Sequence, residues 1–212
     1  MNEERLSRER ERLEAMRLYE RKYEGDYSLI CGVDEAGRGP LAGPVCAGAC
    51  ILKKDEEILY LNDSKKLSEK RREALFLEIK EKALSWSVAF SDEKRIDEIN
   101  ILQATYEAMK KAIEGLSTPP SLLLIDAVHI PDVSIKQVSI VKGDAASVSI
   151  AAASVLAKVS RDHFMKEMDE KYPEYGFAKH KGYGTKAHYE ALKKYGPSPI
   201  HRMTFLKNLS EH

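Results

Sequence analysis

The sequence has no apolar run that approaches the roughly 20 residues needed to span a bilayer, and we expect no membrane association. Its first 26 residues are densely charged, which argues against a signal peptide. Cysteine is scarce: Cys31, Cys46 and Cys50 are an odd number and lack the spacing of metal ligands. These absences predict a cytoplasmic protein whose cysteines are reduced and buried.

The chain also lacks net charge. Its 34 Lys and Arg residues balance 34 Asp and Glu residues, so any basic surface that binds nucleic acid has to be local. Hydrophobic residues make up 43% of the 212 residues, enough for the core of one domain. We find no internal repeat, low-complexity tract or linker.

Hydrophobic periodicity predicts strands that alternate with helices, which indicates an α/β fold with a mixed sheet flanked by helices. The apolar run 122–125 predicts a strand buried on both faces, in a parallel position. Small residues at 47–49 predict that another element packs closely on their strand. The expected strands are 27–33, 44–52, 86–90, 122–125 and 137–141, and the expected helices are 2–26, 68–84, 96–116, 145–171, 186–195 and a short last one.

The most informative stretch runs from Cys31 to Val45 and reads CGVDEAGRGPLAGPV. It predicts a strand that ends in two acids, a tight loop, and a second strand that returns beside the first. Glycine allows a backbone to approach a ligand closely, and the guanidinium of Arg38 is a fork of donors suited to phosphate. Acids next to such a loop indicate divalent metal ions between protein and phosphate.

Three acids, Asp34, Asp126 and Asp144, are expected where apolar strands end, and Glu35 adjoins the first. Any single one could instead be a turn or helix cap, Asp144 in particular, but buried unpaired charge is costly and three strand ends favour a site. Oxygen ligands select Mg²⁺ or Mn²⁺. Two such ions about 3.5–4 Å apart stabilise both the attacking and the leaving oxygen of a phosphodiester, and we expect direct attack by water.

The stretch 31–45, with three further matching segments in the same order, resembles the signature of the ribonuclease HII family. The resemblance implies a ribonuclease H-like core at 27–172 and a helical C-terminal substrate-binding extension at 173–212. The helical N-terminal extension expected at 1–26 is a departure from the shortest members of the family. The resemblance also implies that Asp34, Glu35, Asp126 and Asp144 are the catalytic, metal-binding acids, with Asp34 bridging two ions. Which other acid holds which ion stays open.

The implied activity is hydrolysis of the phosphodiester 5′ of ribonucleotides in duplex DNA, and of RNA in RNA–DNA hybrids, by a monomer. The products would carry a 3′-hydroxyl and a 5′-phosphate, with roles in ribonucleotide excision and RNA primer removal. One alternative is a ribonuclease HIII-like enzyme, a family that usually has lysine where Arg38 stands and a larger N-terminal domain. The other is a non-catalytic nucleic-acid-binding protein on the same fold, which the presence of all four acids argues against.

The resemblance further implies that Gly37, Arg38 and Gly39 contact the 2′-hydroxyl of the ribonucleotide, although the loop could be a plain hairpin turn. It implies that Tyr183 packs on the deoxyribose that follows. The segment 179–207 has seven Lys or Arg residues against one acid, which suits a nucleic-acid groove. For Tyr189 and Tyr195 we favour a core position. Further expected substrate contacts are Ser64, Lys65, Ser154, Lys158 and Lys181.

Residues 2–26 predict one amphipathic helix with a thin apolar stripe. We favour a solvated helix packed on the edge of the domain over a contact with nucleic acid or a partner.

Overall fold

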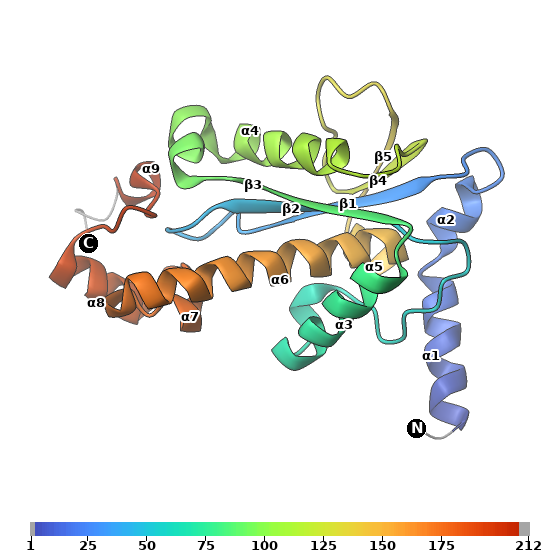
Figure 1. Ribbon diagram of the computed structural model, residues 1–212, viewed down its shortest axis with the longest axis horizontal. Coiled ribbons are helices and arrows are strands. Elements are labelled where there is room, and N and C mark those ends of the chain that lie inside the picture. The colour runs from blue at the N-terminus through green and yellow to red at the C-terminus, as the bar shows by residue number, and fades with distance from the viewer. Residues whose placement is uncertain (1–2, 208–212) are drawn as a thin grey trace.

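The computed structural model describes residues 3–207 and is built around a five-stranded sheet of order β3-β2-β1-β4-β5 (Figure 1). The hairpin β1–β2 and the pair β2–β3 are antiparallel, whereas β4 and β5 run parallel to β1. The parallel position predicted for the apolar run 122–125 is therefore confirmed. The strands are β1 (Ile30–Ala36), β2 (Val45–Ile51), β3 (Ser85–Ser91), β4 (Leu122–Asp126) and β5 (Lys136–Ile140).

One face of the sheet is covered by the long helix α6 (Val148–Lys171), with α3 (Glu69–Lys82) packed beside it (Figure 1). The helix lies so close to the strands that side chains are excluded at two points. A Cβ on Gly32 would stand 2.0 Å from the Ser149 carbonyl carbon, and one on Gly48 would stand 2.4 Å from the Ala153 oxygen. This is the close packing that the small residues of the second strand predicted.

The opposite face is covered by α4 (Glu93–Glu114), which buries Ala104, Ala108 and Met109 against β1 and β2 (Figure 1). The Asp92 carboxylate caps this helix by accepting from the Arg95 amide at 2.8 Å. The helix thus begins three residues before the predicted start at 96. The three cysteines are buried and free, as expected.

The single N-terminal helix predicted for 2–26 is wrong. The chain forms α1 (Glu3–Ala15) and α2 (Leu18–Tyr23), with Arg17 between them in a non-helical conformation. Arg17 is buried and donates to the Glu56 carbonyl, which holds the break. Leu13 and Met16 join the core beneath α3 and α6, so the segment is packed at the domain edge. Residues 1–2 lie outside the described range.

The helix predicted for 145–171 is also interrupted. The short α5 (Gly143–Ala146) precedes α6, and Ser147 between them is extended at φ −138° and ψ 128°. The Ser147 hydroxyl caps α6 by accepting from the Ile150 amide at 3.2 Å. Asp144 therefore does not cap the long helix, which was the alternative for that residue.

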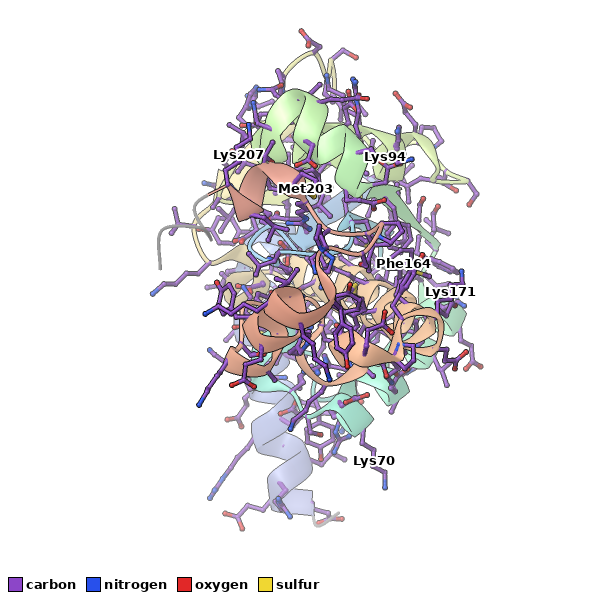
Figure 2. The ribbon with its side chains drawn as sticks, turned by 90° about the vertical axis from the view of Figure 1, so that its left-hand side faces the viewer. Lys70, Lys94, Phe164, Lys171, Met203 and Lys207 are labelled. Carbon is purple, nitrogen blue, oxygen red and sulfur yellow. The ribbon has the colours of Figure 1, made fainter. Side chains whose placement is uncertain are left out.

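The C-terminal segment gathers at the far end of α6. It contains η2 (Pro173–Tyr175), α7 (Phe177–His180), α8 (Lys186–Tyr195) and α9 (Met203–Leu206). Figure 2 shows this end, where α9 with Met203 lies beside α4; the Met203 amide donates to Asp97 of α4 at 2.7 Å. The core position expected for Tyr195 is wrong, since that residue is 50% exposed.

Hydrophobic clusters cross both predicted boundaries of the core, at 26/27 and at 172/173. The division of the chain at these points stays a prediction, and residues 208–212 of its last part lie outside the described range. Among the helices of residues 3–207, none is long and apolar enough to cross a membrane.

Candidate active site

The parallel pairing of β1 and β4 brings the first two acidic positions together. Val33 is in register with Ile125, so Asp34 and Asp126 are the next residues on two neighbouring strands. Asp34 is 4% exposed and lies inside β1, two residues before its end, rather than after it as predicted. Asp126 is the last residue of β4. Glu35 follows Asp34 within β1, and its amide donates to Asp34 Oδ1 at 2.7 Å.

The turn after β5 brings in the third segment. Lys142 is left-handed at φ 57°, and Gly143 and Asp144 then begin α5. The Gly143 amide donates to Asp126 Oδ1 at 2.6 Å, which fixes the start of α5 against the end of β4. Asp144 is buried beside them. Three segments therefore bring together what we call the acid cluster: Asp34, Glu35, Asp126 and Asp144.

Three members of the acid cluster, Asp34, Glu35 and Asp144, resist ionisation. Burial, followed by the charges of Glu35 and Asp126, raises the pKa of Asp34 well above its ordinary value, against a hydrogen bond from Ser154. Burial also raises the pKa of Glu35, with Arg38 opposing the rise. Burial and then the charge of Asp63 raise the pKa of Asp144. Such shifts mean that the folded protein holds these carboxylates together at a cost that a cation would relieve.

The donor set of the acid cluster fits divalent metal ions. The Glu35 Oε2 atom is buried and has no hydrogen-bond partner within residues 3–207. Carboxylate oxygens are the ligands that Mg²⁺ and Mn²⁺ prefer. Nowhere in that range do three His, Cys, Asp or Glu side chains already form a metal-ligating group. Binding thus requires the side chains to turn towards one another, as expected for acids that repel.

The loop after β1 stands at the edge of the acid cluster. Gly37 is left-handed at φ 91°, a conformation that favours glycine. Arg38 is exposed, and its Nη1 lies 3.5 Å from Glu35 Oε1. A Cβ on Gly39 would lie 3.9 Å from the Tyr183 ring, and that ring is 46% exposed. The structure thus places Arg38, Gly39 and Tyr183 on one accessible surface, whereas Gly37 is buried against Arg161.

Two other predicted contacts, Ser64 and Lys65, lie in the 3-10 turn η1 (Ser64–Lys66) beside the acid cluster. The Ser64 and Ser154 hydroxyls are 2.9 Å apart and both are buried, so they order the floor of the site. Lys65 is exposed, and its Nζ lies 3.9 Å from Asp144 Oδ2. Among the ion pairs of residues 3–207, this ammonium and the Arg38 guanidinium, 3.5 Å from Glu35, are the cations that reach the acid cluster.

Lys158 and Lys181 are less available to a substrate than predicted. The Lys158 ammonium is held 2.6 Å from Asp162 on its own helix, and burial lowers its pKa. The Lys181 ammonium donates to the Ala178 carbonyl. Contact of either lysine with a substrate stays a prediction that requires the side chain to leave its partner.

Several residues have roles in the site that the sequence did not predict. Asp63 hydrogen-bonds to Asp144 and adds a carboxyl to its surroundings. Arg161 of α6 is 1% exposed, and Arg202, one of the seven basic residues of the segment 179–207, is fully buried. Both guanidiniums lie under the loop 37–44. Their partners are backbone carbonyls, which no residue pattern discloses.

Comparison with known proteins agrees with this geometry. The family model of ribonuclease HII matches residues 31–208. The ribonuclease HII of Lachnoclostridium phytofermentans is 61% identical over 207 residues, which are 98% of this chain and 81% of that protein. The ribonuclease HII of Clostridioides difficile is 57% identical over 205 residues, 96% and 80% of the two chains.

Among solved structures, the ribonuclease H2 of Pyrococcus horikoshii OT3 superimposes with a TM-score of 0.70 at 28% identity. The superposition covers 83% of this chain and 93% of that one. The predicted fold class, a mixed sheet of the ribonuclease H type flanked by helices, is thereby confirmed.

Proposed function

This chain belongs to the ribonuclease HII family, and on that premise we propose that it hydrolyses the phosphodiester on the 5′ side of a ribonucleotide embedded in duplex DNA. Membership argues against both alternatives, a ribonuclease HIII-like enzyme and a non-catalytic nucleic-acid-binding protein. RNA–DNA hybrids are a second substrate in this proposal, and the products carry a 3′-hydroxyl and a 5′-phosphate. The enzyme acts as a monomer in ribonucleotide excision and RNA primer removal.

The observation that carries the proposal is the acid cluster beside a glycine-rich loop whose residues Arg38 and Gly39 are exposed. Asp34, Glu35, Asp126 and Asp144 would hold two Mg²⁺ or Mn²⁺ ions, with Asp34 between them. Such ions activate water, neutralise charge on the phosphate and stabilise the leaving oxygen. The Ser154 hydroxyl orients Asp34, and the Gly143 amide orients Asp126. Water attacks the phosphorus directly, because this mechanism needs no protein nucleophile.

Selectivity in this proposal comes from two neighbouring sugars. The loop amides of Arg38 and Gly39 donate to the 2′-hydroxyl oxygen and a phosphate oxygen of the ribonucleotide, and the exposed ring of Tyr183 packs on the following deoxyribose. The 2′-hydroxyl is the group that distinguishes RNA from DNA at one position. A lost hydrogen bond is worth only about 1–3 kcal/mol, so larger selectivity requires that the same contact align the phosphate for reaction.

Exposed lysines of the C-terminal extension support duplex binding. Of the seven basic residues between 179 and 207, five are exposed: Lys179, Lys186, Lys193, Lys194 and Lys207. Figure 2 shows Lys207 projecting outward near α9. Their charge would hold phosphates without reading sequence.

Single-turnover cleavage of matched duplexes with zero, one and four consecutive ribonucleotides tests the proposal. We expect efficient cleavage with one ribonucleotide and very little cleavage of the all-DNA duplex. Tyr183→Ala should slow cleavage at the junction more than it weakens binding. Tyr183→Phe is the matched control and should be mild, because the ring and not the hydroxyl does the packing.

A requirement for four ribonucleotides would show that the site recognises the shape of a hybrid helix instead of a junction. Equal cleavage by the Ala and Phe variants would show that the Tyr183 ring does not contact the substrate.

A further inference from the structure

Two arginine side chains are buried beneath the loop that follows β1, and all their hydrogen bonds go to backbone carbonyls. Arg202 donates from Nε to the Gly43 oxygen at 2.9 Å, from Nη1 to the Arg38 oxygen at 2.8 Å and from Nη2 to the Gly37 oxygen at 2.6 Å. Arg202 is thus bonded to three of the eight residues 37–44, from a position more than 150 residues later in the chain.

Arg161 of α6 makes the complementary set. Its Nε donates to the Pro44 oxygen at 2.9 Å and its Nη2 to the Ala42 oxygen at 3.0 Å. Its Nη1 donates to the Lys181 oxygen at 2.9 Å, two residues before Tyr183. Five of the six carbonyls therefore belong to the loop 37–44, and the sixth belongs to the segment that carries Tyr183.

Peptide geometry makes this arrangement relevant to the substrate. In a trans peptide the C=O and the following N–H point in opposite directions, and no peptide bond in residues 3–207 is cis. Because the Gly37 and Arg38 carbonyls point at the buried Arg202, the amides of Arg38 and Gly39 point away from it. Neither amide donates to another group of the described chain, and both residues are exposed.

The two guanidiniums also add charge beneath these amides. Neither forms an ion pair with any carboxylate in the range 3–207. Burial and the neighbouring Arg161 lower the pKa of Arg202 to about 9, so it remains protonated at neutral pH. Buried charge is screened weakly, and the loop surface above it is correspondingly attractive to anionic oxygen.

We propose that Arg161 and Arg202 are positioning residues of the nuclease: they turn the carbonyls of the loop 37–44 inward and so preset the Arg38 and Gly39 amides for the oxygens of the ribonucleotide. Through Lys181, Arg161 also fixes this loop relative to Tyr183. The inference rests on the proposed function for the identity of the ligand, but the ordering of the loop is a property of the free protein. A preset loop loses little freedom on binding, which favours affinity and alignment.

Arg202→Lys is the informative variant, since lysine keeps the charge and most of the stem but cannot span three carbonyls. Arg17→Lys is the matched control: Arg17 is also buried and donates to a backbone carbonyl, that of Glu56, far from the loop. Arg161→Lys replaces Arg202→Lys if circular dichroism shows the latter to be unfolded, with the same expectations.

The first measurement is amide hydrogen exchange in the free, full-length protein. The Leu41 amide donates to the Gly182 oxygen and the Gly43 amide to the Ile200 oxygen, both at 2.8 Å, and these bonds report on loop order. We expect both amides to exchange at least about tenfold faster in Arg202→Lys and at the wild-type rate in Arg17→Lys.

The second measurement is binding in Ca²⁺, which we expect to bind without supporting turnover. Dissociation constants are compared for a duplex with one ribonucleotide and for its all-DNA counterpart. Arg202→Lys should reduce the ratio of the two by about tenfold, the size of one lost hydrogen bond, and Arg17→Lys should leave it unchanged.

Wild-type exchange together with a wild-type ratio in Arg202→Lys would overturn the inference. An equal loss of affinity for both duplexes would also overturn it, because a merely structural role predicts that result. If the wild-type protein itself shows no preference for the ribonucleotide, the proposed function fails, and hydrogen exchange alone then decides whether the arginines order the loop.

Discussion

Two buried charged regions flank the loop 37–44, and their hydrogen bonding differs completely. The acid cluster has four carboxylates, one of which has an oxygen with no partner, and its members repel one another. The second region, which we call the basic junction, comprises Arg161, Arg202, His188 and His201, and each of them is at most 2% exposed. Six carbonyls accept from its two arginines, and its two histidines bond to each other and to backbone.

The difference separates structural from functional burial of charge. Buried polar groups that are fully bonded hold a fold, whereas buried like charges without partners cost stability unless a ligand compensates. The basic junction should therefore matter for folding and positioning, and the acid cluster should matter for binding and chemistry. Substitutions in the two regions should consequently change stability in opposite directions.

The largest expected effect is on catalysis. Asp34→Asn should lower the single-turnover rate with Mg²⁺ by about a thousandfold or more, because Asp34 is the most buried member of the acid cluster and adjoins the charges of Glu35 and Asp126. Asp126→Asn and Asp144→Asn should lower it by orders of magnitude as well. The measurement is cleavage of the duplex with one ribonucleotide.

Asp132→Asn is the matched control, since the Asp132 side chain is 89% exposed and pairs with Lys110, away from the acid cluster. It should retain the wild-type rate. Near-wild-type activity in Asp34→Asn would mean that the acid cluster is not the catalytic site.

The second effect is on metal-linked stability. Without metal, Asp34→Asn should melt at the wild-type temperature or a few degrees above it, because it removes one of the repelling charges. Saturation with Mg²⁺ at about 100 times its dissociation constant should stabilise the wild type by about 2.7 kcal/mol. The variant should gain much less, and Ca²⁺ should stabilise the wild type without supporting cleavage.

Thermal unfolding monitored by circular dichroism measures both quantities, with Asp132→Asn again as the control. A metal-free Asp34→Asn protein that melts well below the wild type would contradict the proposed difference between the acid cluster and the basic junction, since Asp34 would then stabilise the fold.

The sequence predicted the acid cluster much better than the basic junction, and the reason is physical. Asp34 and Asp126 follow apolar runs, which marks both as ends of strands. The resemblance to a known family supplied the topology that makes these strands neighbours, and the parallel pairing of β1 and β4 agrees with it. The partners of Arg202 are the carbonyls of Gly37, Arg38 and Gly43, and every residue has a carbonyl. No residue type marks which of them a distant guanidinium will reach.

The break between α5 and α6 at Ser147 was not predicted, for a related reason. The residues around Ser147 are small or apolar and fit a continuous helix, and the break depends on Glu20 of α2. The Glu20 carboxylate accepts from the Ser147 hydroxyl at 2.5 Å and from the Ser149 amide at 3.0 Å. A contact between residues more than 120 positions apart decides the local conformation there. Hydrophobic periodicity is a local pattern and contains no information about such a contact.

The smallest expected effect is the pH dependence of the histidine pair in the basic junction. Its hydrogen bonds assign both tautomers. The Ser198 amide donates to His201 Nδ1 at 2.8 Å, so His201 carries its proton on Nε2 and donates to His188 Nε2 at 2.9 Å. His188 then donates from Nδ1 to the Tyr183 carbonyl at 2.9 Å. A further proton on either ring would face a hydrogen-bond donor and would break this series of hydrogen bonds.

The sign of the pH effect follows. Burial and then the neighbouring His188 lower the pKa of His201 to about 4, while the unfolded chain has its ordinary value near 6.5. Above pH 6.5 the ring is neutral in both states and stability does not depend on it. As the pH falls from about 6.5 towards 4, the unfolded state takes up the proton first, so the free energy of unfolding falls. After allowance for solvent screening, the loss is on the order of 2 kcal/mol.

The acid cluster acts in the opposite direction in the same metal-free protein. The raised pKa values of Asp34, Glu35 and Asp144 mean that the folded state binds protons more readily than the unfolded state, so acidification relieves their repulsion. Urea unfolding between pH 7.5 and pH 4 should therefore be measured in the Asp34→Asn background, which reduces that opposing contribution.

In that background His201→Asn should flatten the loss of stability between pH 6.5 and pH 4, because it removes the titrating ring. His129→Gln, at an exposed histidine, should leave the slope unchanged. An identical slope with and without His201 would show that the pair tolerates a proton. The hydrogen-bond chain to Tyr183 would then be less rigid than that of the arginines beside it, and the contrast between a fully bonded basic junction and an unpaired acid cluster would hold for Arg161 and Arg202 alone.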